Sequence, residues 1–330
     1  NVYNRNIIQR ALATDFPLKP VVVTANAACA ELVDQNCINH GDWLLWDSLL
    51  GHRLAETAAA MPNSQHALLV HYLAAENPQL DRAERDSMLT TEQQVANTVK
   101  AFIATGQRIA GVLKQRYPNK PVFVAEPGVA ALFLPMVDTT PVRPDQDIVH
   151  LLTVANLLPA KGHLEILTIL SRLSRLNWCW HIVGNNQADA AYVSRIQLAI
   201  EAFGLSERIV FHGILRQTEL VQLLHKMHVF VFASHYEAYG MALAEAVAAG
   251  LPVVSTRVGE VDRLVRQRVN GLLSDVGDWH SFQCHLEKLI RNKTLRTQMQ
   301  NSATSLAPIR TWQEAGNNFI RACQAIQAQN

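Results

Sequence analysis

The amino-acid sequence predicts an α/β protein of two domains, each built on a mostly parallel sheet. Three observations lead to this prediction. The chain has 330 residues, which is enough for two domains of ordinary size. Short apolar runs typical of strands alternate with longer amphipathic segments typical of helices. Between Glu126 and Pro144 a proline-rich stretch with little periodicity interrupts this alternation, so we expect the domains to be connected there.

The first half opens with an amphipathic helix over residues 1–13, whose apolar side chains recur at helical spacing. Strands and helices then follow in turn, which predicts βαβ units with right-handed crossovers. The expected strands are 20–24, 43–46, 66–71, 101–105 and 121–125, and the expected helices are 27–35, 51–61, 81–98 and 107–116.

The alternation restarts at Ile148 and continues to the end of the chain. The expected strands are 150–154, 178–183, 208–212, 228–233, 253–255 and 271–273. The expected helices are 163–176, 190–203, 217–227, 239–249, 259–268 and 311–326, with more than one helix between 278 and about 307. A parallel sheet of this kind gathers the carboxyl ends of its strands at one edge, where α/β proteins bind ligands.

Composition narrows the functional class. A net charge of +1 argues against a dedicated nucleic-acid binder, and neither half is basic enough for electrostatic docking on a membrane, so we expect peripheral membrane contact at most. The five cysteines are odd in number and include no Cys-x-x-Cys pair. This usage favours a reducing, cytoplasmic setting and no structural zinc.

The expected helix 239–249 carries an unusual residue. The helix consists almost wholly of Met, Ala, Leu and Val, so most of its surface should be buried. Glu245 lies in its middle, and a carboxylate taken out of water is costly unless something pairs with it. The partner of Glu245 is a ligand, or else a structural arginine or solvent reached through a gap.

A turn between Asn156 and Gly162 joins a strand to a helix. It places Lys161 and backbone N–H groups at the positive end of that helix, which is the geometry that holds a phosphate. Taken alone, a lysine in a turn is more often a solvated charge.

A second such turn, at Tyr239 and Gly240, lies beside Glu237. Gly240 lets a ligand approach the backbone closely, and the helix start again favours an anion. The loop at Gly184 lies at the same edge of the predicted sheet. Together these loops predict a nucleotide site.

These loops form part of a longer pattern. It comprises 155–162, Phe211-His212-Gly213, Glu237-Ala238-Tyr239-Gly240, Glu245-Ala246, 249–254 and 270–273, with fainter matches at 102–105 and 126–129. The pattern resembles the nucleotide-binding domain of family-4 retaining glycosyltransferases, including the Glu-x7-Glu motif formed by Glu237 and Glu245. The resemblance implies the GT-B fold, in which two Rossmann-like domains face each other across a cleft.

On this interpretation residues 1–140 form an N-terminal, acceptor-side Rossmann-like domain and residues 141–310 bind the nucleotide sugar. Residues 311–330 form a helix that packs at the domain junction. Members of the family open with a strand and a glycine-rich loop, whereas this chain begins at what looks like the following helix. We therefore expect the N-terminal domain to lack its first strand.

The resemblance also implies roles for individual residues. Glu245 takes the ribose hydroxyls, Glu237 holds the donor sugar and Lys161 neutralises the diphosphate leaving group. His71, at a strand end, touches the donor sugar or acceptor, or else is structural. The other implied donor contacts are Asn156, Gly184, Gly213, Ile214, Tyr239, Gly240 and Met241. The implied reaction transfers a sugar from a nucleotide-diphosphate donor to an unknown acceptor, with no metal and no cofactor.

Two residues depart from the family pattern. Asn156 stands where an arginine usually accompanies the lysine, and Glu260 places an acid in a turn that is usually glycine-rich. Arg257 and Arg263 are the candidates to compensate. These departures and the missing front leave a second hypothesis, a catalytically inactive module that binds a nucleotide sugar. A GT-B epimerase or phosphorylase is a third, and a dehydrogenase is disfavoured because no Gly-x-Gly-x-x-Gly follows a strand.

Overall fold

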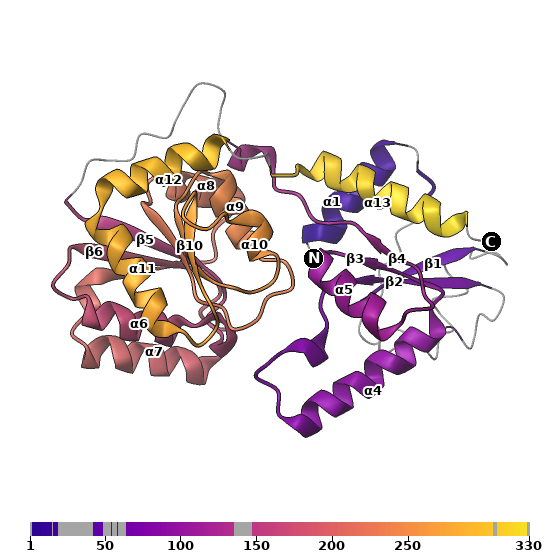
Figure 1. Cartoon of the computed structure of the whole chain (residues 1–330), viewed down its shortest axis with the longest axis horizontal. Helices are drawn as coiled ribbons and strands as arrows, with labels where there is room; N and C mark the ends of the chain where they lie inside the picture. The colour runs from indigo at the N-terminus through magenta and orange to yellow at the C-terminus, as the bar shows by residue number, and fades with distance from the viewer. Residues whose placement is uncertain are drawn as a thin grey trace. The chain divides into compact units, whose positions relative to one another are not determined.

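A computed structural model describes residues 2–14, 16–18, 42–48, 54, 58, 64–134, 147–305 and 309–328. The chain divides into two compact units (Figure 1), Asn1–Gly128 with Arg310–Asn330, and Val129–Ile309. The expected strand 20–24 and helix 27–35 lie outside the described residues, as does most of the expected helix 51–61. The proline-rich stretch is described as far as Leu134 and includes a 3-10 turn, η3, at Ala131–Phe133.

Unit 1 contains four parallel described strands in the order β1-β2-β3-β4. Their bounds are β1 Trp43–Asp47, β2 Gln65–Val70, β3 Ala101–Ala104 and β4 Val122–Val124. The short turn η2 (Ala74–Glu76) and helix α4 (Arg82–Thr98) connect β2 to β3, and α5 (Gln107–Arg116) connects β3 to β4. Asp81 and Glu84 form a capping box that fixes the start of α4.

The C-terminal helix belongs to unit 1. Helix α13 (Trp312–Gln327) packs on α1 (Val2–Ala13), so the first and last described helices lie side by side (Figure 1). Gly316 permits this close approach, because a Cβ atom there would lie 2.3 Å from the Arg10 Cγ atom. Ile7 and Phe319 belong to the apolar cluster that includes residues of β2 and β3.

The described residues of unit 2 contain six parallel strands in the order β10-β9-β8-β5-β6-β7. Their bounds are β5 Val149–Val154, β6 Trp178–Val183, β7 Ile209–Gly213, β8 Val229–Phe232, β9 Val253–Thr256 and β10 Gly271–Ser274. The central strands β8 and β9 are buried throughout, as expected for a sheet covered on both faces.

Helices cover both faces of this sheet (Figure 1). One apolar layer includes α6 (His163–Arg172), α7 (Ala190–Ala202) and α11 (Trp279–Arg291), and α12 (Lys293–Ser305) follows α11. The other includes α8 (Gln217–Leu224), α9 (Met241–Ala248) and α10 (Val261–Leu264). The 3-10 turns η4 (Pro159–Lys161) and η5 (Ser206–Arg208) precede α6 and β7.

The strand order creates a switch point. From β5 the chain adds β6 and β7 on one side, then returns to add β8, β9 and β10 on the other. The loops that follow β5 and β8 therefore leave neighbouring strands in opposite directions, which opens a crevice at the carboxyl edge between them. This edge is where ligands bind in open α/β sheets.

The observed elements follow the sequence predictions closely, except at the expected helix 259–268. Helix α10 ends at Leu264, and Val265 is extended with φ −118° and ψ 118°. The Asn270 side-chain oxygen accepts from the Arg266 N–H at 2.7 Å, and Gln267 pairs with Gly271 in a parallel bridge. Apolar spacing alone overextended this helix, because an asparagine turn ends it early.

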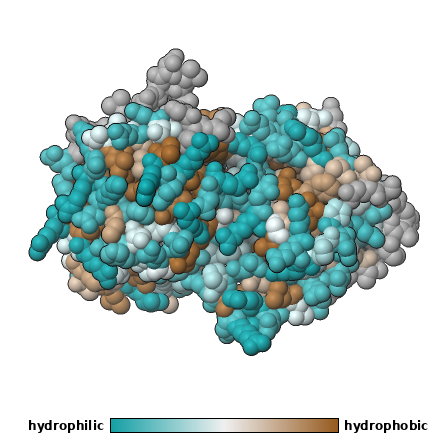
Figure 2. Space-filling model, in the orientation of Figure 1, coloured by the Kyte–Doolittle hydropathy of each residue, from teal (hydrophilic) through white to brown (hydrophobic). Residues whose placement is uncertain are grey.

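The molecular surface is of an ordinary kind. The face drawn in Figure 2 is mostly hydrophilic, with scattered hydrophobic patches. Among the described helices, none combines the length and apolar character that crossing a membrane requires.

Candidate functional site

Hydrogen bonds join the loops after five neighbouring strands of unit 2. We call these loops, 155–162, 184–188, 214–216, 233–240 and 257–260, the rim. The joining bonds run from Gly184 N to Gly213 O at 2.8 Å, Asn185 N to the Asn156 side-chain oxygen at 3.0 Å, His235 N to Ala160 O at 2.8 Å, and Glu260 N to Tyr239 O at 3.1 Å. Parallel strands place these loops at one edge, and the bonds hold them as one surface.

Lys161 and Glu237 meet across the switch point. Lys161 ends η4, and its Nζ forms an ion pair with Glu237 Oε1 from the loop after β8. The two side chains are 23% and 17% exposed, so solvent and small ligands can reach both. Ser234 Oγ donates to the same Glu237 oxygen at 3.4 Å. The fold thus brings a cation and an anion together from positions 76 residues apart.

Helix α9 begins beside this pair without a side-chain cap. Its N-cap residue Gly240 has φ 99° and ψ 55°, a left-handed conformation that a side chain disfavours. The helix dipole adds partial positive charge at this end. The stretch from Tyr239 to Met241 is therefore suited to bind an anion.

Glu245 lies one turn into α9, on the same face as Met241. None of the described side chains hydrogen-bonds or ion-pairs with it, and burial raises the pKa of its carboxyl to about 7. The sequence left three partners open for Glu245: a ligand, a structural arginine or solvent. No described arginine pairs with it. The structure therefore leaves this carboxyl as an acceptor for a ligand or for solvent.

Ile214, on the rim, and Gly213, the last residue of β7, lie at an open part of the same edge. A Cβ atom on Gly213 would meet nothing within 4 Å, and Ile214 is 76% exposed. Gly184 is packed instead, because a Cβ atom there would lie 2.0 Å from the Ala155 carbonyl oxygen. Asn156 is exposed but its side-chain oxygen is engaged by the Asn185 N–H. Gly184 and Asn156 thus help to hold the rim loops together.

Three polar residues near Lys161 were not among the predicted site residues. His163, directly after the turn, is fully buried, and neither of its ring nitrogens has a hydrogen-bond partner among the described residues. Burial lowers the pKa of this imidazole to about 4. His235 Nε2 lies 2.9 Å from Glu165 Oε1. The polar pair Ser234-His235 directly after an apolar strand is the sequence signal that could have identified part of this group.

Glu260, one of the two departures from the family pattern, and the two arginines expected to compensate all form local ion pairs. Glu260 is 4% exposed, and its carboxylate lies 3.5 Å from Arg263 Nε, so its charge is balanced within the turn. Arg257 forms ion pairs with Asp262 and Asp275. Both arginines therefore have acidic partners of their own, and neither has to supply a cation beside Lys161.

His71 belongs to unit 1 and follows β2. Its Nε2 lies 3.1 Å from Asn4 Oδ1 and 3.4 Å from Asp47 Oδ2, and its ring makes an edge contact with Tyr3 at 5.0 Å between centroids. Its side chain is only 14% exposed. This network fixes the ring at the carboxyl edge of the unit 1 sheet, and its role toward a substrate stays a prediction.

A cavity of about 240 Å³ lies in unit 1, away from the residues predicted to act. It is lined mainly by apolar side chains, among them Leu73, Met88, Val95 and Phe102. Glu92 also lines it, and its carboxylate is paired with Arg116. The lining of this cavity thus includes none of the residues predicted to act, and we place the site at the rim, where charged groups converge.

Comparisons with known proteins identify relatives of this chain. The chain is 28% identical over 287 residues to the D-inositol 3-phosphate glycosyltransferase of Corynebacterium efficiens, covering 82% of this chain and 65% of the relative. It is 28% identical over 163 residues to the lipopolysaccharide core biosynthesis glycosyltransferase LpsE of Rhizobium meliloti, covering 49% and 46%. The chain thus spans less than two thirds of the length of these relatives.

Among solved structures, Anabaena Alr3699/HepE in complex with UDP and glucose superposes with a TM-score of 0.72 at 18% identity, covering 85% of this chain and 78% of that one. This likeness confirms the expected α/β fold with Rossmann-like units. The sequence model of the family described as glycosyl transferases group 1 matches residues 141–306, half of the chain and nearly all of unit 2. The chain therefore belongs to the group 1 glycosyl transferases.

Proposed function

We propose that this protein is a retaining glycosyltransferase of family 4, which transfers a sugar from a nucleotide-diphosphate donor to an acceptor. The observation that carries the proposal is the Lys161–Glu237 pair at the switch point, next to the uncapped start of α9. A cation, an uncapped helix start and a carboxylate at one place match a diphosphate joined to a sugar. The membership in the family supports the same activity.

Each part of the donor has a matching group on the rim. The diphosphate accepts from Lys161 Nζ and from the N–H groups at the start of α9. The ribose hydroxyls donate to Glu245, which supplies this carboxylate with the partners that the protein does not provide. The base lies over the open surface at Gly213 and Ile214.

The chemistry follows from these contacts. Negative charge develops on the diphosphate as the bond to the sugar breaks, and Lys161 stabilises that charge. Glu237 releases Lys161 to the phosphate and accepts from hydroxyls of the donor sugar. The acceptor attacks from the face that the diphosphate leaves, with a departing phosphate oxygen taking its proton, so the configuration of the sugar carbon is retained.

We propose that this step needs no metal ion, since Lys161 and the helix amides already balance the diphosphate charge. One Asp-x-Asp spacing does occur, at Asp145-Gln146-Asp147, and this is a spacing that can hold a divalent cation. Asp147 is exposed and precedes β5, at the amino edge of the sheet, whereas the rim lies at the carboxyl edge. Activity that persists in a chelator supports metal independence, and activity lost to it and restored by Mg²⁺ contradicts it.

The substrates of similar proteins suggest which donors and acceptors to test first. One solved neighbour is in complex with UDP and glucose, so UDP-glucose is the first donor to test. The relatives named above act on inositol phosphate or in lipopolysaccharide core biosynthesis, so polyol phosphates and outer-membrane saccharides are the first acceptors.

Calorimetric titration with UDP-, GDP- and ADP-sugars tests the donor site. We expect one of them to bind, with affinity reduced at least tenfold in Lys161→Ala and unchanged in Lys226→Ala, a lysine on the loop after α8 at the opposite edge of the sheet. Unaltered binding in Lys161→Ala would remove this site from the mechanism. NMR of the product anomer then decides whether configuration is retained, and donor binding without transfer or hydrolysis favours the inactive module.

A further inference from the structure

Four of the thirteen histidines form a row across the sheet of unit 2, one from each of four neighbouring strands or their ends. In order they are His228, His150, His181 and His212. The Nδ1 atom of His150 lies 2.9 Å from Nε2 of His181, and Nδ1 of His181 lies 2.9 Å from Nε2 of His212. The ring of His228 stacks on His150, with 5.6 Å between centroids.

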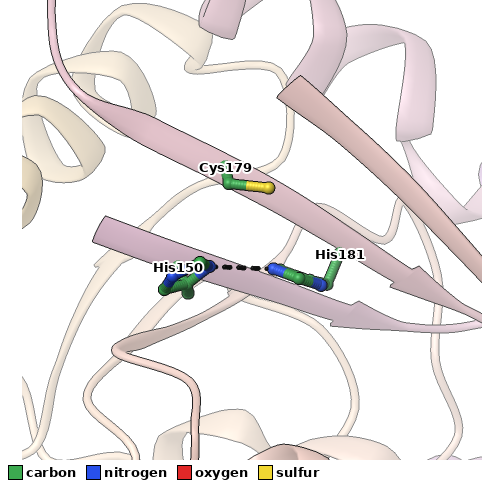
Figure 3. A group of neighbouring side chains, drawn as sticks. All are labelled: His150, Cys179 and His181. Atoms are coloured by element: carbon green, nitrogen blue, oxygen red, sulfur yellow. Dashed lines mark hydrogen bonds between the residues drawn. The ribbon is translucent and has the colours of Figure 1, made fainter. Parts of the chain in front are cut away.

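Cys179 joins this row at its centre. His150 and Cys179 are directly opposite each other in the β5–β6 register, and His181 lies two residues beyond Cys179 on the same face. The two imidazoles face each other with the thiol nearby (Figure 3), and one ligand atom from each of the three residues lies within 4.8 Å of the others. His150 and Cys179 are partly exposed, so an ion can reach the cluster from their side.

The cluster is distinct from the rim. His150 and Cys179 are the second residues of β5 and β6, at the amino ends of the strands. Asn156, on the rim, is six residues beyond His150, which corresponds to about 20 Å along an extended strand. The donor site therefore does not account for His150 and Cys179, whereas His212, at one end of the row, directly precedes Gly213.

The sheet face that carries the row is otherwise apolar. Leu152 and Phe230 share it with His150 and His228 and belong to the buried layer under α8 and α9. Burying an imidazole in such an apolar layer costs free energy of desolvation unless its ring nitrogens have interaction partners. Here the ring nitrogens of His150, His181 and His212 engage one another across the three strands.

We propose that His150, Cys179 and His181 bind one zinc ion, with water as the fourth ligand. Two nitrogens and a thiolate form a donor set that prefers zinc to magnesium or calcium. A tetrahedral site with Zn–N bonds of about 2.0 Å and a Zn–S bond of about 2.3 Å needs its ligand atoms about 3.3 to 3.5 Å apart. The two imidazole nitrogens lie 2.9 Å apart and the three ligand atoms lie within 4.8 Å of one another, so side-chain rotation can bring them to these distances.

Zinc binding replaces one hydrogen bond between two histidines with three metal–ligand bonds to the protein. The ion takes the place of the hydrogen bond between His150 and His181, and the proton in that bond moves to the outer nitrogen of one ring. The thiol of Cys179 releases its proton to solvent as the Zn–S bond forms. His212 accepts from Nδ1 of His181 and thereby aims Nε2 of that ring at the ion, as outer partners of metal-bound histidines do. The ion then cross-links β5 to β6.

Zinc titration of the metal-free full chain against a chromophoric chelator tests the site. We expect one ion bound, with affinity reduced at least tenfold in Cys179→Ser and in His181→Gln. The matched control is Cys284→Ser, because Cys284 Sγ also lies near a histidine nitrogen, His280 Nε2 at 3.8 Å, but outside the cluster. The zinc affinity of the Cys284→Ser variant should equal that of the wild type. Equal affinity in all four proteins, or no binding by the wild type, would overturn the proposal.

Two further measurements keep the result independent of folding defects. Cobalt in place of zinc should give a thiolate-to-metal charge-transfer band in the wild type and in Cys284→Ser, and none in Cys179→Ser. Circular dichroism identifies any variant that fails to fold. His150→Gln, which keeps the thiol, then takes the place of that variant in the titration, and we expect the same loss of zinc affinity from it. A cobalt band that survives in folded Cys179→Ser assigns the thiolate elsewhere and refutes the site.

Discussion

Glu245→Gln should make the ligand-free protein more stable above pH 7 and leave its stability little changed near pH 4.5. Burial raises the pKa of this carboxyl from 4.5 to about 7, because no described residue stabilises the charged form. A folded state with the higher pKa binds a proton that the unfolded chain has already lost. The contribution of the protonated carboxyl is therefore complete below pH 4.5 and is lost as the pH rises through 7.

The size of the effect follows from the shift. A difference of about 2.5 pKa units corresponds to about 3.4 kcal/mol at most. Glu245 keeps some contact with solvent, so we expect about 2 to 3 kcal/mol between the variant and the wild type at pH 8. For a unit of this size that difference raises the unfolding temperature by about 5 to 10 °C. Glutamine supplies a neutral group of the same shape and so removes the cost of ionisation.

Scanning calorimetry at pH 5 and pH 8 measures both proteins. The control is Glu201→Gln on α7, where the glutamate is exposed and its neutralisation should change stability little at either pH. A variant no more stable than the wild type at pH 8, or equally stabilised at both values, would refute the interpretation of Glu245 as a carboxyl without a protein partner. Nucleotide-sugar binding should weaken in the same variant, as expected of a site residue whose environment trades stability for function.

Three further predictions concern residues of the rim and the first residue of helix α6. Gly162→Ala should lower the free energy of unfolding by more than about 3 kcal/mol, since its Cβ atom would lie 2.1 Å from the Ala233 carbonyl oxygen. Gly204→Ala has a similar φ of 64° but open space, so chemical denaturation should show a loss of only about 1 to 2 kcal/mol. The wild type should lose stability as the pH falls from 6.5 to 4, because burial lowers the pKa of His163 to about 4 and protonation of this imidazole opposes folding. His163→Leu should lose less stability over the same range, and equal pH profiles of the two proteins would contradict this. Lys161→Ala should lower the rate of sugar transfer by about a hundredfold or more with the fold intact, and a rate near that of the wild type would contradict its role at the leaving group.

Much of the fold was predictable from the sequence because strand and helix periodicity is local. The described strands of unit 2 begin and end within about two residues of the predicted bounds, and the turns at Lys161 and Gly240 lie at helix starts as expected. The overextended helix after Gly259 shows the limit. A side-chain hydrogen bond from a residue outside a helix, here Asn270, decides where the chain turns, and spacing alone does not record it.

The site residues were named from sequence, but their arrangement was not. No local pattern states that β8 lies beside β5, and this adjacency is what brings Glu237 to Lys161. The same holds for Glu260, which appeared to be a charge in the sugar-facing turn and proves to be buried against Arg263. The cysteine spacing likewise could not have predicted the proposed zinc site, because His150 and Cys179 belong to different strands and meet only through the β5–β6 register.

The sequence by itself determined the α/β class, the succession of elements and the chemical types gathered at the loops, since all three depend on residues close together along the chain. The tertiary structure alone decided which charges are paired, which carboxyl stays without a partner and which histidines align. The physical reason is that sheet order and register place distant segments 5 Å apart or 20 Å apart, and the free energy of a charged group depends on that placement rather than on its neighbours in sequence.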